Sequence, residues 1–488
     1  MLPTVEKLLV LESRPLRQAL EVIDATAQGL CFVVDDSGRM TGMLTDGDIR
    51  RALLGGANLQ VPVRQVMRRE FVRLPVGSSA ETIQEALTSK IRVVPLLAEG
   101  GRPIDYASHY RVNAIELARP SFNGNELAYA TDCIKSGQIA TRGEYTERFE
   151  GAVAEYVHAP FAVAASSGSA ALELALLALE IGSGDDVIVP AFASSAVAER
   201  VLGLGAVPVF VDVDPQSWTL NVADVAAALS ARSKAIIAVH VYGQVCDMDP
   251  LRALATKHGL AVIEDASDAF GARYKDESIG SHSDAAVFDF GEAKAPTTGA
   301  GGMVVFHDRL RHDRAKMVRD QGRDSHDSLS YWLAGSNCHL TNIQAAIGLA
   351  QVEQAAAIVE GKRRVADAYT RRLRELDGIE LPGQPPTTFN VSSPYTVLVN
   401  EHSRVTRAEL AERLRYNGID SHSALVSLHL MPSYQKHAAG RKCPVSARLS
   451  EMVLCLPSDP SMSDEEIEIV CRSFESIFFV RRYLRGNK

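Results

Sequence analysis

The stretch Phe288-Asp-Phe-Gly-Glu-Ala-Lys-Ala-Pro-Thr-Thr-Gly-Ala-Gly-Gly302 decides the fold of this chain. It places Lys294 in a glycine-flanked loop between two short apolar runs, 285–290 and 302–306, which we predict to be strands. A lysine in a loop is usually a solvated surface residue. Here the glycines allow the backbone to come close beside the side chain, and a strand on each side fixes the loop. The pattern therefore favours a lysine that is held in place for chemistry.

Two further features lie upstream of this loop. A predicted strand ends in Glu264-Asp265, and open α/β sheets bind ligands beyond the carboxyl ends of their strands. The run Ala165-Ser-Ser-Gly-Ser169 joins another predicted strand to an apolar helix, where unpaired helix amides can bind an anion. Each feature also has a simpler interpretation, because Asp265 and the serines can act as ordinary helix caps.

Together, the three features match what pyridoxal phosphate requires. A lysine forms the Schiff base, an acid keeps the pyridine nitrogen protonated, and helix-start amides hold the phosphate. Burial beside a bound aldehyde lowers the pKa of such a lysine and makes it nucleophilic. The chain contains no GxxxxGK[ST], HExxH or GxSxG motif, and no predicted strand is followed by GxGxxG. The histidines show no metal-binding spacing, so we expect no metal.

From Ile115 onward, short apolar strands alternate with helices, which is typical of a mainly parallel sheet buried on both faces. We expect one long helix from Asn342 to near Leu376. After Pro394, two strand-like runs and two predicted helices indicate a small α+β domain. The expected fold class is α/β, with a seven-stranded sheet flanked by helices and a small C-terminal domain.

The region before residue 108 contains a repeated α/β unit, and its most specific stretch is Gly42-Met-Leu-Thr-Asp-Gly-Asp-Ile-Arg50. This region resembles a tandem CBS pair. The resemblance implies that Thr45 and Asp48 bind the phosphate and ribose of an adenine nucleotide. The second half of the repeat lacks a matching Thr-x-x-Asp. The alternative is that Thr45 only caps the following helix and no ligand binds.

Residues 113 to 480 resemble the DegT/DnrJ/StrS family of sugar aminotransferases. The matching motifs are Leu117-Ala-Arg-Pro-Ser121, Ser167-Gly-Ser-Ala-Ala-Leu172, Val187-Ile-Val-Pro-Ala191, Phe210-Val-Asp-Val-Asp-Pro215, His240-Val-Tyr-Gly-Gln244, Ile263-Glu-Asp-Ala266 and Thr341-Asn-Ile-Gln-Ala-Ala-Ile-Gly348. The resemblance implies fold type I and pyridoxal phosphate, with Lys294 as the Schiff-base lysine and Asp265 as the partner of the pyridine nitrogen. It implies a homodimer with shared active sites. The residues it places around the phosphate are Gly168, Ser169, Ala170 and, from the neighbouring subunit, Asn337.

The chain departs from the family pattern at several cofactor positions. Ser194 stands where an aromatic ring usually stacks on the cofactor, with Phe192 two positions away. Asp268 replaces a glutamine, and Asp289 replaces a serine that binds the phosphate. A carboxylate beside a phosphate is repulsive. These departures raise the alternative of a catalytically weak member that serves as a ligand-binding or regulatory protein.

The leading expectation is a transaminase that moves an amino group from glutamate to a nucleotide-linked keto-sugar, for polysaccharide or glycoconjugate biosynthesis. The 488 residues predict three domains, a CBS-like domain at 1–108, a cofactor-binding domain at 113–378 and a small domain at 379–488. The net charge of -9 argues against nucleic-acid or anionic-membrane partners. Seven scattered cysteines and the lack of a signal-like or membrane-spanning run favour a cytoplasmic location.

Overall fold

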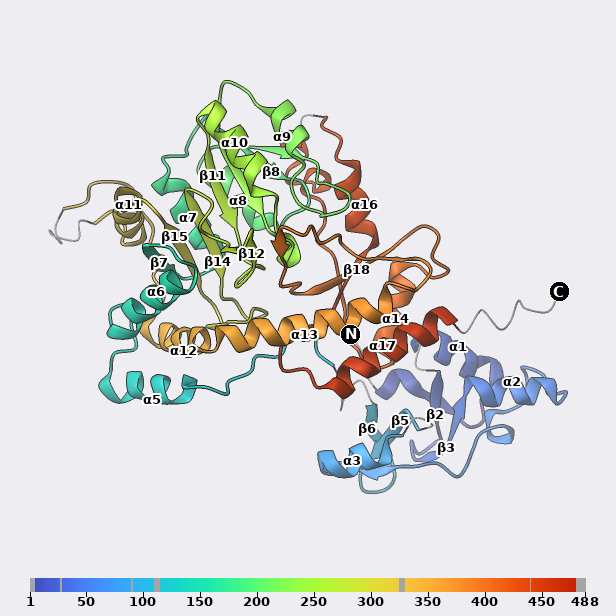
Figure 1. The fold of residues 1–488 in the computed structure, drawn as a ribbon. Coiled ribbons are helices and arrows are strands. Elements are labelled where there is room, and N and C mark those ends of the chain that lie inside the picture. The colour runs from blue at the N-terminus through green and yellow to red at the C-terminus, as the bar shows by residue number, and fades with distance from the viewer. Residues whose placement is uncertain are drawn as a thin grey trace. The chain divides into compact units, whose positions relative to one another are not determined.

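The computed structural model describes residues 5–26, 29–88, 91–108, 115–323, 330–438 and 440–479. The chain forms two compact units, Met1–Ile115 with Glu412–Ile419, and Glu116–Ala411 with Asp420–Lys488 (Figure 1). The predicted division of the second unit at 378/379 stays a prediction. The predicted domain start at 113 lies outside the described residues.

The first unit contains two three-stranded sheets of the same topology. In each sheet, the first strand pairs in parallel with the second, and the second pairs antiparallel with the third. The internal repeat predicted from the sequence is therefore confirmed by strand order. The elements are β1 (Leu9–Leu11), α1 (Leu16–Thr26), β2 (Leu30–Val34), β3 (Met40–Thr45), α2 (Asp46–Leu54), β4 (Leu74–Pro75), α3 (Ala80–Ala86), β5 (Val93–Leu97) and β6 (Pro103–Ser108), with 3-10 turns at Val5–Leu8 and Val63–Gln65.

The second unit is built on a seven-stranded sheet in the order β7-β15-β14-β11-β10-β8-β9. Only β15 runs antiparallel to its neighbours, so the predicted, mainly parallel sheet is confirmed. The strands are β7 (Phe161–Ala165), β8 (Asp186–Pro190), β9 (Val207–Val211), β10 (Ser233–Val239), β11 (Ala261–Asp265), β14 (Ala285–Asp289) and β15 (Gly302–Phe306). The helices are α5 (Glu126–Ser136), α6 (Glu144–Tyr156), α7 (Gly168–Ala178), α8 (Ser195–Gly203), α9 (Val222–Ala228), α10 (Met248–His258), α11 (Arg309–Arg319), α12 (Asn342–Glu353) and α13 (Ala355–Leu373).

Both faces of this sheet are covered, as its apolar strands require. Successive residues of β8 illustrate this, because Val187 and Val189 belong to one buried apolar cluster and Ile188 belongs to the other. All three side chains are fully buried. The two clusters fix the sheet, and the loops that follow its strands carry the candidate site.

Smaller sheets and helices complete the C-terminal part of the chain. The segment after residue 378 supplies a four-stranded sheet of order β16-β18-β20-β19, and a three-stranded sheet has the order β13-β12-β17. These strands are β12 (Arg273–Tyr274), β13 (Glu277–Ser278), β16 (Ile379–Glu380), β17 (Thr388–Phe389), β18 (Tyr395–Val399), β19 (His422–Ser423) and β20 (Val453–Leu456). The helices are α14 (Arg407–Tyr416), α15 (Gln435–Ala438), α16 (Pro444–Met452) and α17 (Asp464–Phe479).

The prediction of a single long helix after Asn342 is wrong. The structure has two helices, and Gln354 between them adopts φ −104° and ψ 8°, outside the helical range. Its amide side chain donates to Glu126 at 3.0 Å. The break therefore coincides with a residue whose side chain is bound to α5.

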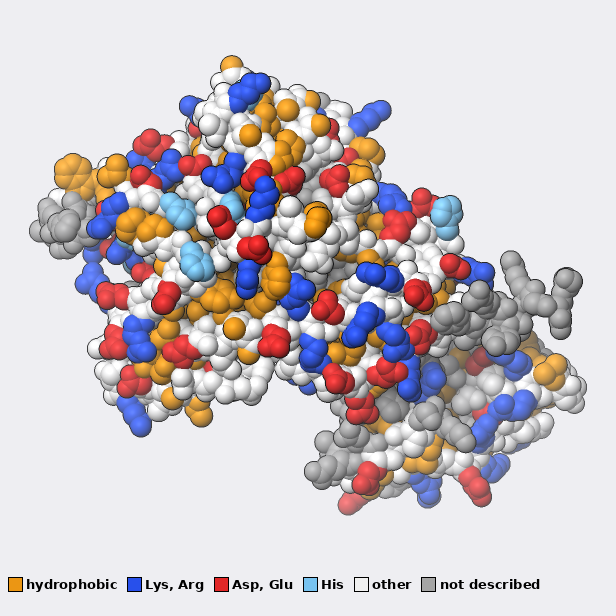
Figure 2. Space-filling model, in the orientation of Figure 1, with side chains coloured by type: hydrophobic (Ala, Val, Ile, Leu, Met, Phe, Trp, Pro, Cys, Tyr) orange, Lys and Arg blue, Asp and Glu red, His pale blue; other side chains and the backbone are white. Residues whose placement is uncertain are grey.

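The surface shows no separation of charge on the face seen in Figure 2, where acidic and basic side chains are interspersed. Within the described ranges, no helix is both long and apolar enough to cross a bilayer.

Candidate functional site

Lys294 lies in the loop between β14 and β15, as the sequence predicts. Two threonines pin this loop, because the hydroxyl groups of Thr297 and Thr298 each donate to the carbonyl of Phe290 at 3.2 Å. The ammonium of Lys294 donates to the Asp268 carboxylate and lies 3.9 Å from Asp289 Oδ2. The lysine is thus a fixed side chain in contact with carboxylates, and its side chain is 27% exposed.

Carboxylates control the charge of Lys294. Burial lowers the pKa of this lysine, but the nearby charges of Asp268, Asp289 and Asp265 outweigh it, so the pKa is raised above its usual value. The structure therefore brings together the lysine and three of the acids that the sequence singled out. These carboxylates therefore stabilise Lys294 as an ammonium.

Asp265 ends β11 and is buried, with 7% of its surface exposed. Its Oδ1 accepts from the backbone N–H of Ser267 at 3.1 Å and from the Ser267 hydroxyl at 2.5 Å. Burial raises the pKa of Asp265, and Asp268 adds to this, whereas the Ser267 hydrogen bonds and Lys294 lower it. A cationic partner, such as a pyridinium, would stabilise the charged form of a carboxylate buried in this way.

A second buried acid lies beside Asp265 in β11. Glu264 Oε2 is 3.1 Å from His240 Nε2, and both side chains are fully buried. The N–H of Cys246 donates to His240 Nδ1, so Nε2 carries the hydrogen that Glu264 accepts. Ser283 donates to the other carboxylate oxygen at 2.7 Å. Our interpretation of the sequence gave these side chains no role, although the motif that begins at His240 is the signal that could have found them.

The predicted phosphate cradle lies at the start of α7. Ser167 is the N-cap, and its hydroxyl accepts from the N–H of Ala170 at 3.1 Å. The capping interpretation thus holds for Ser167. Ser169 is only half-buried, and no group in the described part of the chain hydrogen-bonds to its hydroxyl, which leaves it available to an anion.

Asp289 faces this helix start. A Cβ placed on Gly168 would lie 2.8 Å from the Asp289 Cβ, and Gly291 donates its N–H to Asp289 Oδ1 at 3.1 Å. Burial raises the pKa of Asp289, and Asp268 adds to this, although Lys294 and the N–H groups of Gly291 and Gly168 lower it. A carboxylate therefore sits beside the amides that an anion would use.

The remaining cofactor positions predicted from the sequence are Asp268, Ser194 and Phe192. Asp268 Oδ2 accepts from the N–H of Tyr242 at 3.1 Å, so both of its carboxylate oxygens are bonded. Ser194 is exposed and caps α8. Phe192 is fully buried and meets Tyr242 edge-on, with ring centroids 5.9 Å apart. Phe192 is thus engaged in the core and does not supply the exposed ring that Ser194 lacks.

Asn337 lies on a separate segment and has an exposed side chain. The next residue, Cys338, accepts from the N–H of Ser166 at 2.8 Å, so this segment runs beside the start of α7. The approach of Asn337 to a partner subunit stays a prediction.

These residues fit pyridoxal phosphate. The observation that carries the fit is the start of α7, where unpaired helix amides can bind an anion and the half-buried Ser169 lies in the first turn. A buried acid at a strand end and a loop lysine complete the donor set. Asp289 is the one group that opposes an anion there.

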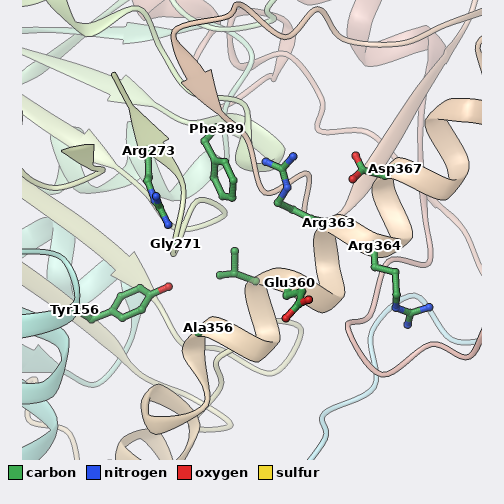
Figure 3. A pocket seen from close by; sticks show the side chains of 10 residues that line it. Tyr156, Gly271, Arg273, Ala356, Glu360, Arg363, Arg364, Asp367 and Phe389 are labelled. Atoms are coloured by element: carbon green, nitrogen blue, oxygen red, sulfur yellow. The ribbon is translucent and has the colours of Figure 1, made fainter. Parts of the chain in front are cut away.

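A separate cavity of about 570 Å³ lies between α13 and the short strands β12 and β17 (Figure 3). The guanidinium groups of Arg363 and Arg273 lie 4.0 and 5.0 Å from the centroid of the Phe389 ring. The cavity is also lined by Tyr156, Gly271, Ala356, Val359, Glu360, Arg364 and Asp367.

In the first unit, Thr45 and Asp48 are brought together but bind each other. Thr45 caps α2 in a reciprocal capping box, and its hydroxyl is 2.6 Å from Asp48 Oδ2. Arg51 and Arg68 reach Asp48 Oδ1 at 2.6 and 2.7 Å. Burial raises the pKa of Asp48, but the hydrogen bonds from Thr45 and both arginines outweigh it and lower the pKa. The capping interpretation of Thr45 is confirmed, and the nucleotide stays a prediction.

Comparison with known proteins identifies both regions. The model of the DegT/DnrJ/EryC1/StrS aminotransferase family matches residues 120–475. The chain belongs to this family. A CBS domain model matches residues 4–55, so the chain also carries a CBS domain at its N-terminus.

Relatives with assigned names match most of the aminotransferase region. GDP-perosamine synthase of Escherichia coli O157:H7 is 36% identical over 75% of this chain and 98% of that protein. The UDP-N-acetyl-3-dehydro-alpha-D-glucosamine 3-aminotransferase of Acidithiobacillus ferrooxidans is 38% identical over 66% of this chain and 84% of that protein. Among solved structures, S. venezuelae DesV aligns with a TM-score of 0.69 and 33% identity, over 73% of this chain and 94% of that one. The predicted fold type is confirmed.

Proposed function

We propose that this protein is a pyridoxal-phosphate-dependent aminotransferase that transfers an amino group, from glutamate, to a keto-sugar on a nucleotide carrier. The observation that carries the proposal is the contact of Lys294 with Asp268, beside buried Asp265 and the start of α7. The alternative of a catalytically weak, ligand-binding member is not favoured, because the two relatives described above carry the names of a GDP-perosamine synthase and of a nucleotide-sugar aminotransferase.

Each residue has a defined task in this chemistry. The cofactor, when bound, supplies an electron sink. Asp265 would hold the proton of the pyridine nitrogen. The Nζ of Lys294 would take the proton that leaves the α-carbon of the amino donor, as a general base, and would then deliver it to the reactive carbon of the cofactor, as a general acid. Asp268 orients Nζ, and the amides at the start of α7 hold the phosphate.

The relatives support a nucleotide-linked sugar as the amino acceptor. Their names specify sugars on both GDP and UDP. We therefore assign the class, a nucleotide-linked keto-sugar, and the assay below separates the carriers. An amino sugar of this kind serves the synthesis of a surface polysaccharide or glycoconjugate.

We also propose a homodimer. Large apolar side chains are exposed on α5 and in the segment before Asn337, with Leu127 82%, Ile134 65% and Trp332 71% exposed. A second copy that covers these side chains would remove apolar surface from water. In such a dimer, Asn337 reaches the phosphate of the neighbouring subunit.

We also propose a cytoplasmic location. All seven cysteines are free and buried, which supports a compartment where thiols stay reduced.

We further propose that the first unit binds an adenine nucleotide. This binding requires Thr45 and Asp48 to exchange partners, because the two side chains are bonded to each other and Asp48 is also bonded to arginines.

The test of function is an amino-transfer assay with ¹⁵N-glutamate. Purified protein loaded with pyridoxal phosphate is incubated with GDP-linked or UDP-linked keto-sugars, and products are analysed by mass spectrometry. We expect ¹⁵N in the sugar nucleotide with at least one carrier and none with Lys294→Ala. If both carriers stay unlabelled while 2-oxoglutarate also fails to form, the proposed function is wrong.

A further inference from the structure

The cavity between α13, β12 and β17 contains two arginines that lie over one aromatic ring and have no role in the chemistry above. The guanidinium carbon of Arg363 is 4.0 Å from the centroid of the Phe389 ring, and that of Arg273 is 5.0 Å from the same centroid. The two side chains lie on opposite sides of the ring in Figure 3. Because both guanidinium groups are so close to one ring, a single small molecule in the cavity can contact both.

The polar edges of these two guanidinium groups are free. No group in the described part of the chain hydrogen-bonds to Arg273 or Arg363, and no carboxylate there lies within 4.0 Å of their nitrogens. Glu360 and Asp367 also line the cavity, but neither pairs with these arginines. A guanidinium that lies with its face over a ring keeps the N–H groups at its edge available to an acceptor.

The next residue of α13 differs from Arg363 in this respect. Arg364 pairs with the Asp464 carboxylate at 2.6 Å and also donates to the carbonyl of Met462. Its guanidinium points away from the Phe389 ring in Figure 3. Arg363 is half-buried and lacks such a partner, so an anion in the cavity would offset the cost of its burial.

Tyr156 adds a third donor to the cavity. Its ring is held against Phe270, with ring centroids 4.8 Å apart and planes 9° apart. No described group hydrogen-bonds to its hydroxyl, which points toward the cavity in Figure 3. Burial raises the pKa of Tyr156, and the charge of Arg273 lowers it, which places the two side chains close together. The volume of about 570 Å³ is in the range of small-molecule sites.

We propose that this cavity binds the diphosphate group of a small molecule, through the guanidinium groups of Arg273 and Arg363 and the hydroxyl of Tyr156. The fork of N–H groups on a guanidinium matches two oxygens of a phosphate, and two such forks match two phosphates. A single carboxylate gains less, because Glu360 and Asp367 repel it and it cannot satisfy both arginines. This site is separate from the residues assigned to amino transfer and does not rest on that function.

The test is isothermal titration calorimetry of the full-length protein, saturated with pyridoxal phosphate, with inorganic pyrophosphate at constant ionic strength. We expect Arg363→Gln and Arg273→Gln each to weaken the binding of pyrophosphate by about tenfold, because each removes charge-assisted hydrogen bonds to a phosphate. The side chain of Arg273 is exposed, so its substitution should leave the fold intact. Pyrophosphate that binds elsewhere on the chain is not affected by either change.

Arg309→Gln is the matched control. Arg309 also lies over a ring, at 5.6 Å from the centroid of Phe161, but it pairs with Asp313 at 2.8 Å. This variant loses the same charge and should bind pyrophosphate as the wild type does. Wild-type protein that binds no pyrophosphate, unchanged affinity in both cavity variants, or an equal loss in Arg309→Gln overturns the proposal.

Nucleoside diphosphates distinguish the source of the diphosphate group. GDP, UDP and ADP are titrated in the same way into the wild type and the two cavity variants. Tighter binding than that of pyrophosphate, lost in the same variants, shows that the site takes a nucleotide. Affinities equal to that of pyrophosphate show that the diphosphate group alone is recognised. Binding of all three that is the same in the wild type and in both cavity variants contradicts the assignment to this cavity.

Discussion

At the scale of single residues, Asp289 distinguishes this site from the family pattern. Its carboxylate lies against Gly168 and accepts from Gly291, so it occupies space next to the helix amides that would hold a phosphate. Among the described residues, the cation within 4.0 Å of its carboxylate is Lys294. We therefore expect Asp289 to weaken cofactor binding and not to abolish it.

The first prediction is that Asp289→Ser tightens the binding of pyridoxal phosphate by about tenfold, which corresponds to relief of roughly 1.4 kcal/mol of repulsion. Asp289→Asn is the matched control, because it removes the charge and keeps the shape, and it should also tighten binding. Titration of apo-protein at constant ionic strength measures both. Wild-type affinity equal to that of both variants would show that Asp289 does not repel the phosphate.

The second prediction concerns pH. Burial raises the folded-state pKa of Asp289 above its unfolded value. The protonated acid therefore stabilises the apo-protein below the unfolded pKa, and this contribution is lost as pH rises through the folded pKa. Thermal unfolding should show Asp289→Ser gaining stability over wild type as pH rises from acid to neutral. A difference that stays constant over this range would contradict the assignment.

The predicted positions of Lys294 and Asp265 relative to strand ends are confirmed, and their roles stay predictions. Lys294 and Asp265 could be predicted because the ends of buried strands are visible in sequence and parallel strands place these ends at one edge of the sheet. Lys362, a buried lysine on α13, could not be predicted, because its burial depends on how α13 packs on the loop at Ala295, 67 positions away. Its sequence signal, a lysine within an amphipathic helix, is shared with many solvated lysines.

At the scale of elements, the boundaries of helices were set by capping side chains. The cap at Thr45 was visible in sequence, as was the strand before it. The break between α12 and α13 was not visible in the sequence, because it depends on Gln354, whose side chain binds the distant Glu126. Asp48 completes the capping box and binds two arginines, and its predicted contact with a nucleotide stays a prediction.

The third prediction is that Thr45→Val destabilises the first unit by about 1 kcal/mol, because the N-cap of α2 is lost. Thr45→Ser retains the cap and should unfold as wild type does. Denaturant unfolding of both proteins, followed by circular dichroism, measures the difference in free energy of unfolding. Equal stability of all three proteins would show that the capping box contributes nothing.

At the scale of the whole molecule, the chain divides into two compact units, as expected for an N-terminal module followed by an aminotransferase region. The first unit has its own buried clusters and a repeated topology, and a CBS domain model matches its first half. Its border near residue 110 was predictable from the change from a short repeat to long strand–helix alternation. The inclusion of residues 412–419 in the first unit was not predictable from the sequence, because it depends on a pairing of Ile115 with Ile419.

The fourth prediction is that removal of residues 1–110 leaves a soluble homodimer. The cut keeps Ile115 and its hydrogen bond to Gly418, and the apolar side chains Leu127 and Trp332 remain to be covered by a partner. Sedimentation velocity gives the mass of the full chain and of the shortened chain. Leu127→Asp should weaken association in both. Monomeric behaviour of the full chain at micromolar concentration would rule out the proposed dimer.

The central claim is that Lys294 carries the cofactor, and chemical trapping tests it most directly. Holoprotein is reduced with borohydride, digested and mapped by mass spectrometry. We expect one phosphopyridoxyl group, on the peptide that contains Lys294, and none in Lys294→Ala. An unmodified Lys294, or an adduct on Lys362 or another lysine of the wild-type protein, would contradict the account.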